Sequence, residues 1–261
     1  MPKVKINDIE LYYETHGEGP AIVFAHGAGG NHLSWWQQIP AFSSDYRCIT
    51  FDHRGWGASV EPPGGPGRAA FVEDVKQLLD HLGVEQTFLV AQSMGGRACL
   101  GFALTYPERT LGLVLGDTTG GATDPALVEA MQGAPAPGTG LNRMLAQTTI
   151  ERRSDLAFLY SEISDLNPPR PATQAGNDGG PMAADLQKLT IPTLLIVGEE
   201  DAIAPVKVMQ ALQGLIPSSR LEVVPGAAHS TYFEQPAEFN RLVREFFTPV
   251  LAGTAAVVAD A

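Results

Sequence analysis

Short apolar runs of strand length alternate with longer amphipathic patterns along most of this chain, and this alternation restricts the folds that it can adopt. A hairpin is predicted for residues 4–15, with its turn at Asn7 and Asp8, because these residue types favour tight turns. Six further runs have the length and apolar character of buried strands: 21–25, 47–52, 88–93, 111–117, 193–198 and 220–224.

Helical patterns separate these runs. In residues 69–82, apolar side chains such as Phe71, Val75 and Leu78 recur at the spacing of one helix face, and Gly83 follows as a stop signal. Strands that alternate with helices are typical of a parallel sheet with helices on both faces. We therefore predict an α/β fold with a doubly wound, mostly parallel, eight-stranded sheet. Further helices are predicted at 94–106, 205–215 and 236–247.

The alternation stops in the middle of the chain. Pro- and Gly-rich pieces occur at 134–138 and 167–171, and helical patterns occur at 141–147 and 156–166. A long interruption of this kind favours a helical lid over an active site. We therefore predict one core domain, residues 1–118 and 186–248, with an inserted lid, residues 119–185, and a poorly ordered Ala-rich tail, residues 249–261.

Composition excludes several classes of function. With 261 residues, of which 44% are hydrophobic, the chain is long enough to bury a full core. The formal net charge of −12 argues against nucleic acid as a partner, because such binding requires clustered Lys and Arg.

Residues 1–5 begin no apolar leader and no segment has the length of a membrane span, so we predict a cytoplasmic protein without membrane association. Cys48 and Cys99 are too few for a disulfide framework and are predicted to be core residues.

The segment around Ser93 carries the strongest chemical signal. An apolar strand ends at this serine and passes directly into a helix, so the hydroxyl is expected to project above the carboxyl end of the sheet. Ala91 and Gly95, two positions to either side, leave room for so sharp a turn, and the new helix points backbone N–H groups at the same place. The alternative is a serine that merely caps a helix.

A serine hydroxyl is a weak nucleophile until a neighbouring base takes its proton. His229 lies in a Gly- and Ala-rich loop between the last predicted strand and the final helix, where it is suited to be that base. A buried carboxylate must then hold the imidazole tautomer. Asp201 and Asp117 both follow predicted strands, and Glu199 and Glu200 are expected to be solvated.

Together these segments resemble the α/β-hydrolase superfamily. Residues 91–95 match its nucleophile elbow, G-x-S-x-G, with Ala91 in place of the first glycine. Residues 24–30 resemble its oxyanion loop, and residues 229–236 resemble its catalytic-histidine loop. Residues 52–59 match its D-x-R-G-x-G-x-S segment, whose role is structural.

The resemblance implies a role for each matched residue. Ser93 is the expected nucleophile, His229 the base and Asp201 the acid, with Asp117 as the rival acid. The expected oxyanion donors are the backbone N–H groups of Ala28 and Met94, with Gly29 as a substitute for Ala28. His26 and His53 are expected to be structural. The residues near the predicted site that we expect to bind substrate are Gly27, Gly29, Trp35, Gln92, Tyr160 and Tyr232.

The reaction that best fits this set is hydrolysis of a carboxylic ester or lactone through an acyl-enzyme. Its partner would be a small-molecule substrate with an apolar portion. Carbon–carbon bond hydrolysis is the nearest alternative, and a lyase or a small-molecule receptor of the same fold is a more distant one. No cluster of His, Cys, Asp and Glu has metal-ligand spacing, so neither a metal nor another cofactor is predicted.

Overall fold

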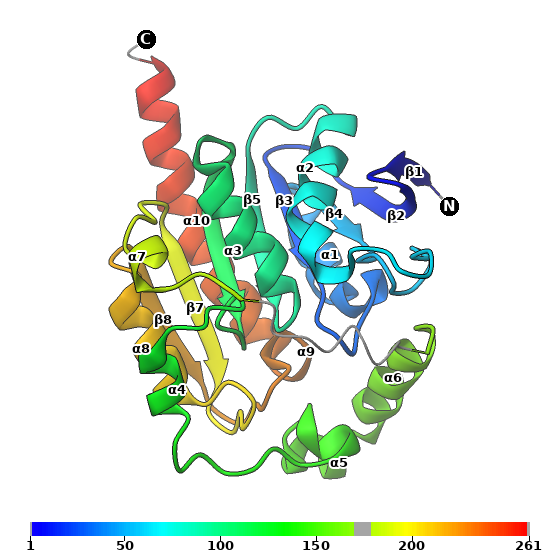
Figure 1. Ribbon diagram of the computed structural model, residues 1–261, viewed down its shortest axis with the longest axis vertical. Coiled ribbons are helices and arrows are strands. Elements are labelled where there is room, and N and C mark those ends of the chain that lie inside the picture. Colours follow the sequence, from blue (N-terminus) through cyan, green and yellow to red (C-terminus); the bar gives the residue numbers. More distant parts are fainter. Residues whose placement is uncertain (1, 170–178, 260–261) are drawn as a thin grey trace.

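The computed structural model describes residues 2–169 and 179–259 and is built around one sheet (Figure 1). The eight strands of the sheet follow the order β1-β2-β4-β3-β5-β6-β7-β8. The pairs β1–β2 and β2–β4 are antiparallel, and all other neighbours are parallel, which confirms the predicted architecture. The strands are β1 (Lys3–Ile6), β2 (Ile9–His16), β3 (Ala21–Ala25), β4 (Arg47–Phe51), β5 (Thr87–Gln92), β6 (Thr110–Gly116), β7 (Thr193–Gly198) and β8 (Ser219–Val224).

The first two strands form the predicted hairpin. Ile6 pairs with Ile9, and the two residues between them, Asn7 and Asp8, have φ angles of 41° and 65°. Asn and Asp tolerate this left-handed conformation better than other residues with a side chain, and two such residues in succession match the right-handed twist of a hairpin.

Helices cover both faces of the sheet because the side chains of its central strands alternate between two apolar clusters. In β5, Leu89 and Ala91 belong to one cluster, whereas Phe88 and Val90 belong to the other. The first cluster packs under α2 (Phe71–His81), α3 (Gly95–Thr105) and α8 (Val206–Leu215). The second packs under α1 (Gln38–Phe42) and α10 (Pro236–Ala259). Shorter elements are η1 (His32–Trp35), η2 (Gly67–Ala70), η3 (Pro107–Arg109) and α9 (Thr231–Glu234).

The insertion between β6 and β7 is helical, as predicted, although one of its helices is displaced. The predicted helix 156–166 corresponds to α6, but the predicted helix 141–147 is wrong. A short turn ends at Arg143 and a new helix begins at Gln147, because Ala146 between them is extended, with its N–H bound to Glu234. Part of the Pro-rich piece 167–171 lies outside the described residues. The elements are α4 (Pro125–Ala130), η4 (Gly140–Arg143), α5 (Gln147–Arg152), α6 (Ser154–Asp165) and α7 (Ala183–Leu186).

Two further expectations differ from the structure. The strand predicted as buried at 220–224 is the edge strand β8, in which Val224 is the buried residue, because β7 is its one neighbour in the sheet. The tail after Thr248 was expected to be poorly ordered, whereas α10 continues to Ala259. Alanine has the highest helix propensity of all residues, so an Ala-rich segment readily extends a helix that is already anchored.

The cysteines are core residues, as predicted. Cys48 in β4 and Cys99 in α3 are both fully buried free thiols. Burial raises the pKa of the Cys48 thiol to about 12 and that of Cys99 further still, so neither sulfur is activated as a nucleophile. Within residues 2–169 and 179–259, no helix is both long and apolar enough to cross a bilayer.

Candidate active site

The turn at Ser93 is as sharp as the sequence predicts. β5 ends at Gln92 and α3 begins at Gly95, and Ser93 between them has a φ of 48°. Residues with a side chain rarely adopt this conformation, and it persists only where the surroundings enforce it. Here the Ser93 N–H donates to the Gly116 carbonyl (3.0 Å) and the Thr118 hydroxyl donates to the Ser93 carbonyl (2.7 Å).

Glycine is required beside this turn for steric reasons. A Cβ atom at Gly95 would lie 2.2 Å from the Ala25 carbonyl oxygen, so the start of α3 can approach β3 only without a side chain there. At Gly27 a Cβ would lie 1.9 Å from the Gln92 side-chain oxygen. The two glycines therefore bring the loop after β3 against the serine turn.

The structure brings Ser93, His229 and Asp201 together in hydrogen-bonding order. His229 Nε2 lies 2.9 Å from Ser93 Oγ, and His229 Nδ1 lies 2.9 Å from Asp201 Oδ2. The other Asp201 oxygen accepts hydrogen bonds from the backbone N–H groups of Ile203 (2.7 Å) and Ala204 (3.0 Å). His229 and Asp201 are both buried, at 2% and 4% exposure, so water does not weaken their contact.

Asp117 occupies a different position from Asp201. Its Oδ1 accepts hydrogen bonds from the Gly198 N–H (3.1 Å) and the Thr231 hydroxyl, and its Oδ2 accepts from the Thr231 N–H (2.9 Å). It thereby ties the end of β7 to the segment that follows His229. Burial, together with the nearby Asp201 charge, raises the pKa of Asp117 to about 7.

The charges around His229 favour its protonated form. Burial alone would lower the pKa of the imidazole, but the Asp201 carboxylate, through its charge and hydrogen bond, raises that pKa above the usual value. The Asp117 charge adds to this increase, whereas the positive charge of Arg143 opposes it. An imidazole in this setting can accept a proton from a hydroxyl and hold the resulting charge.

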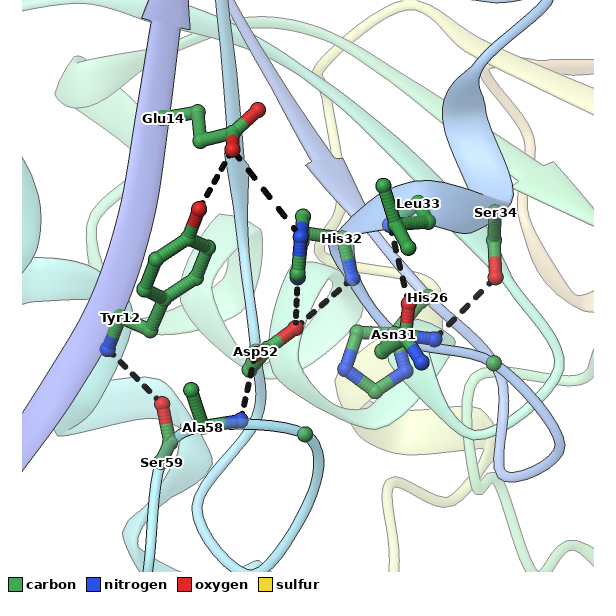
Figure 2. A network of polar contacts seen from close by, with 12 residues as sticks. Tyr12, Glu14, His26, Asn31, His32, Leu33, Ser34, Asp52, Ala58 and Ser59 are labelled. Carbon is green, nitrogen blue, oxygen red and sulfur yellow. Dashed lines mark hydrogen bonds and ion pairs between the residues drawn. The ribbon is translucent and has the colours of Figure 1, made fainter. Parts of the chain in front are cut away.

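A network of polar contacts fixes the loop that leads from β3 to η1 (Figure 2). Asp52, at the end of β4, accepts hydrogen bonds from the backbone N–H (2.7 Å) and ring Nδ1 (2.8 Å) of His32, and from the Ala58 N–H (2.8 Å). His26 Nε2 accepts from the His53 N–H (2.9 Å), and its Nδ1 donates to the Gly27 carbonyl (2.8 Å). The segment 52–59 thus supports this loop, and His26 and His53 lie within that support.

A cavity of about 580 Å³ opens above Ser93 and His229. Gly29 and Tyr160, both predicted to contact substrate, line it. Ala28 lines it too, and within the described part of the chain neither the Ala28 nor the Met94 N–H donates a hydrogen bond to a protein group. The remaining lining residues are Arg68, Gly140, Leu141, Arg143, Met144, Ser161, Ser164, Asp165 and Ile203.

Four of the residues predicted to contact substrate lie behind the cavity wall instead. The rings of Trp35 and Tyr232 are 4.6 Å apart within the apolar core, because both side chains pack under α10. Gln92 is buried and donates a 2.6 Å hydrogen bond to the His229 carbonyl, and Gly27 packs against it. These residues support the backbone of the site and do not line its cavity.

Sequence reasoning missed most of the cavity wall that the insertion supplies. In α6, the pairs Tyr160–Ser161 and Ser164–Asp165 recur four residues apart, so they share one helix face toward the cavity. Leu156 and Ile163 of the same helix are buried in the core. Across the described ranges, no three metal-ligating side chains gather closely enough to hold an ion.

Comparison with known proteins identifies the family. A family model described as alpha/beta hydrolase fold matches residues 20–139 and 138–236. The chain belongs to the α/β-hydrolase fold family.

Two curated relatives align with this α/β-hydrolase over nearly the whole length of both chains. 3-Oxoadipate enol-lactonase 2 of Acinetobacter baylyi is 32% identical over 90% of this chain and 92% of its own. A putative 2-succinyl-6-hydroxy-2,4-cyclohexadiene-1-carboxylate synthase of Bacillus subtilis is 30% identical over 91% of this chain and 95% of its own. Among solved structures, a thermophilic esterase from Thermogutta terrifontis superposes with a TM-score of 0.84 at 29% identity, covering 96% of this chain and 99% of that one.

Proposed function

We propose that this α/β-hydrolase cleaves a carboxylic ester or lactone of a small molecule through an acyl-enzyme formed on Ser93. The observation that carries the proposal is the continuous hydrogen-bonded chain from Ser93 Oγ through His229 to Asp201, with 2.9 Å at each step. It opens into a cavity large enough for a small molecule.

In the proposed mechanism each group has its own step. His229 Nε2 takes the proton of Ser93 Oγ as that oxygen attacks the substrate carbonyl, while Asp201 stabilises the imidazolium. The negative charge that develops on the carbonyl oxygen is held by the backbone N–H groups of Ala28 and Met94. His229 then returns the proton to the leaving oxygen, and a water activated by the same imidazole releases the acid and regenerates Ser93.

The relatives support this reaction class. The enol-lactonase of A. baylyi and the T. terrifontis esterase are named for lactone and ester cleavage, and both align with nearly all of this chain. A second candidate is carbon–carbon bond hydrolysis. A meta-cleavage product hydrolase from Pseudomonas fluorescens superposes with a TM-score of 0.78 at 26% identity. Attack of Ser93 on a ketone carbonyl, with His229 as base, would begin such a reaction. A panel of esters, lactones and diketones distinguishes the two.

The decisive test is the reactivity of Ser93. We expect a fluorophosphonate probe to label the wild-type chain at Ser93, because the probe reports a serine activated by a base. Ser93→Ala should abolish labelling and lower the turnover of a short p-nitrophenyl ester by roughly 10⁴-fold or more. Ser230→Ala is a matched control, since Ser230 is a buried serine one residue from His229 whose hydroxyl donates to Tyr160 (3.4 Å). Wild-type turnover in Ser93→Ala would exclude the mechanism.

A further inference from the structure

The charge of the cavity wall is opposite to that of the whole protein. The chain has 29 acidic and 17 basic residues, with a formal net charge of −12. The described residues that line the cavity above Ser93 nevertheless include two arginines, Arg68 and Arg143, and one acidic residue, Asp165. The wall therefore carries an excess of positive charge in a strongly acidic molecule, and this local excess determines which ligands the cavity attracts.

Arg143 is the more informative of the two arginines. It ends η4 of the insertion and lines the same cavity as Ser93 and His229. Its charge lies near enough to His229 to disfavour protonation of that imidazole. Other exposed arginines of this chain, such as Arg153 and Arg241, pair with carboxylates at 2.9 Å and 2.7 Å. By contrast, the Arg143 guanidinium makes no ion pair with any residue of the described ranges.

Arg68 brings a second guanidinium to the cavity from the core domain. It is half-buried in η2, and it also lines a smaller neighbouring cavity of about 170 Å³, together with Arg97. Guanidinium groups bind carboxylates through planar, paired hydrogen bonds, so two of them on one wall suit an anionic group. The hydroxyls of Ser161 and Ser164 on α6 supply further donors to the same space.

The rest of the wall limits the size and character of the ligand. Leu141, Met144 and Ile203 supply apolar surface for a short carbon chain. Asp165 offsets one of the two positive charges, so the wall favours a ligand with one negative charge over a strongly charged polyanion.

We propose that this cavity selects esters or lactones that carry a carboxylate group, with Arg143 as the main determinant of that preference and Arg68 as its partner. This inference rests on the proposed function, because it names the substrate class of the same site. It adds a carboxylate to the apolar portion that the sequence predicts for the substrate.

The test compares esters that differ in charge but little in shape. One pair places the charge on the acyl part: p-nitrophenyl monoglutarate against p-nitrophenyl valerate. The other places it on the alcohol part: 4-carboxyphenyl acetate against 4-carbamoylphenyl acetate. We expect kcat/KM to favour the anion by about tenfold in one pair, the preference that one charged hydrogen bond typically supplies. Arg143→Gln should remove this preference, because kcat/KM for the anion falls toward that for the neutral ester when both are measured above the pH at which activity levels off.

Arg152→Gln is the matched control, because Arg152 is an exposed arginine on α5 that does not line the cavity and loses the same charge. If Arg152→Gln lowers the preference for the anionic ester as much as Arg143→Gln does, loss of positive charge anywhere on the protein explains the effect. The proposal would then be wrong. If neither pair favours the anion while the neutral esters are cleaved, the substrate class is wrong and the hydrolase assignment stands.

Absence of turnover and of Ser93 labelling would instead contradict the proposed function. In that case binding of monomethyl glutarate, which carries one carboxylate and one ester, still tests the anion site when calorimetry compares Ser93→Ala with Ser93→Ala/Arg143→Gln. Equal binding to the two variants, or no binding to either, would overturn the inference.

Discussion

The edge of the sheet and the insertion contribute to this site in different ways. Ser93, Asp201 and His229 each follow the carboxyl end of a parallel strand, where backbone hydrogen bonds and buried packing fix their positions. The insertion between β6 and β7 supplies short helices and exposed apolar side chains, with Phe158 at 66% and Leu166 at 61% exposure. The sheet edge therefore positions the proposed catalytic groups, while the insertion supplies much of the cavity wall above them.

One of the contacts that join the two regions is a buried carboxylate. Glu234, at the end of α9, accepts a 2.7 Å hydrogen bond from the Ala146 N–H of the insertion and a 2.8 Å hydrogen bond from the Ala228 N–H. Ala228 directly precedes His229. Two hydrogen bonds, both accepted by Glu234, thus connect the insertion to the backbone next to His229, so that a displacement of the insertion can move the imidazole.

The largest expected effect lies at the sheet edge, and it separates the two aspartates. Asp201→Asn should lower turnover of the p-nitrophenyl ester by roughly 10⁴-fold, because the amide neither fixes the His229 tautomer nor stabilises the imidazolium. Asp117→Asn should cost less than about tenfold in turnover, since Asp117 contacts Gly198 and Thr231. Steady-state kinetics on both variants measure the difference.

For the free energy of unfolding we expect the opposite order, with a greater loss of stability in Asp117→Asn than in Asp201→Asn. An asparagine at position 117 has one oxygen where the aspartate has two, so one buried N–H loses its acceptor and unfolding becomes easier by about 1–3 kcal/mol. Denaturant unfolding of the two variants checks this. A greater loss of turnover in Asp117→Asn than in Asp201→Asn would assign the acid role to Asp117.

An intermediate effect is expected where the two regions meet. Glu234→Gln keeps the shape of the side chain but places an NH₂ group against one of two N–H donors, so either Ala146 or Ala228 loses its acceptor. We expect unfolding to become easier by about 1–3 kcal/mol and kcat/KM to fall by about tenfold, as His229 loses its support. Glu199→Gln is the control, because Glu199 is an exposed carboxylate outside this path. A Glu234→Gln variant as stable and active as wild type would show that this carboxylate does not couple the two regions.

The same contrast explains how much of the structure the sequence predicts. The strands, the hairpin turn at Asn7 and Asp8 and the turn at Ser93 follow from local patterns, since apolar alternation and turn chemistry act within a few residues. The pairing of His229 with Asp201 is a contact between distant segments, and it was expected because both residues follow strands that end at one edge.

The insertion was less predictable because long-range contacts determine it. Ala146 interrupts the predicted helix 141–147 through its bond to Glu234, a residue 88 positions away in the sequence. Likewise, no local pattern places Arg143 in the cavity, or moves Trp35 and Tyr232 behind its wall, because each depends on how the insertion and α10 pack against the sheet. Local sequence patterns therefore identify the candidate catalytic residues better than they identify the residues that line the cavity.

The smallest expected effect tests whether the insertion influences the chemistry at the sheet edge. His229 must be neutral to accept the Ser93 proton, so kcat/KM for a neutral ester should rise with pH through an apparent pKa above the usual histidine value, because Asp201 stabilises the charged imidazole. Arg143 opposes that charge. Arg143→Gln should therefore move this rise in activity to higher pH, whereas Arg152→Gln, which removes an exposed charge outside the cavity, should leave it in place. Coincident pH profiles for the two variants at low ionic strength would show that Arg143 does not affect the titration of His229. A shift confined to Arg143→Gln would show that the insertion influences this imidazole.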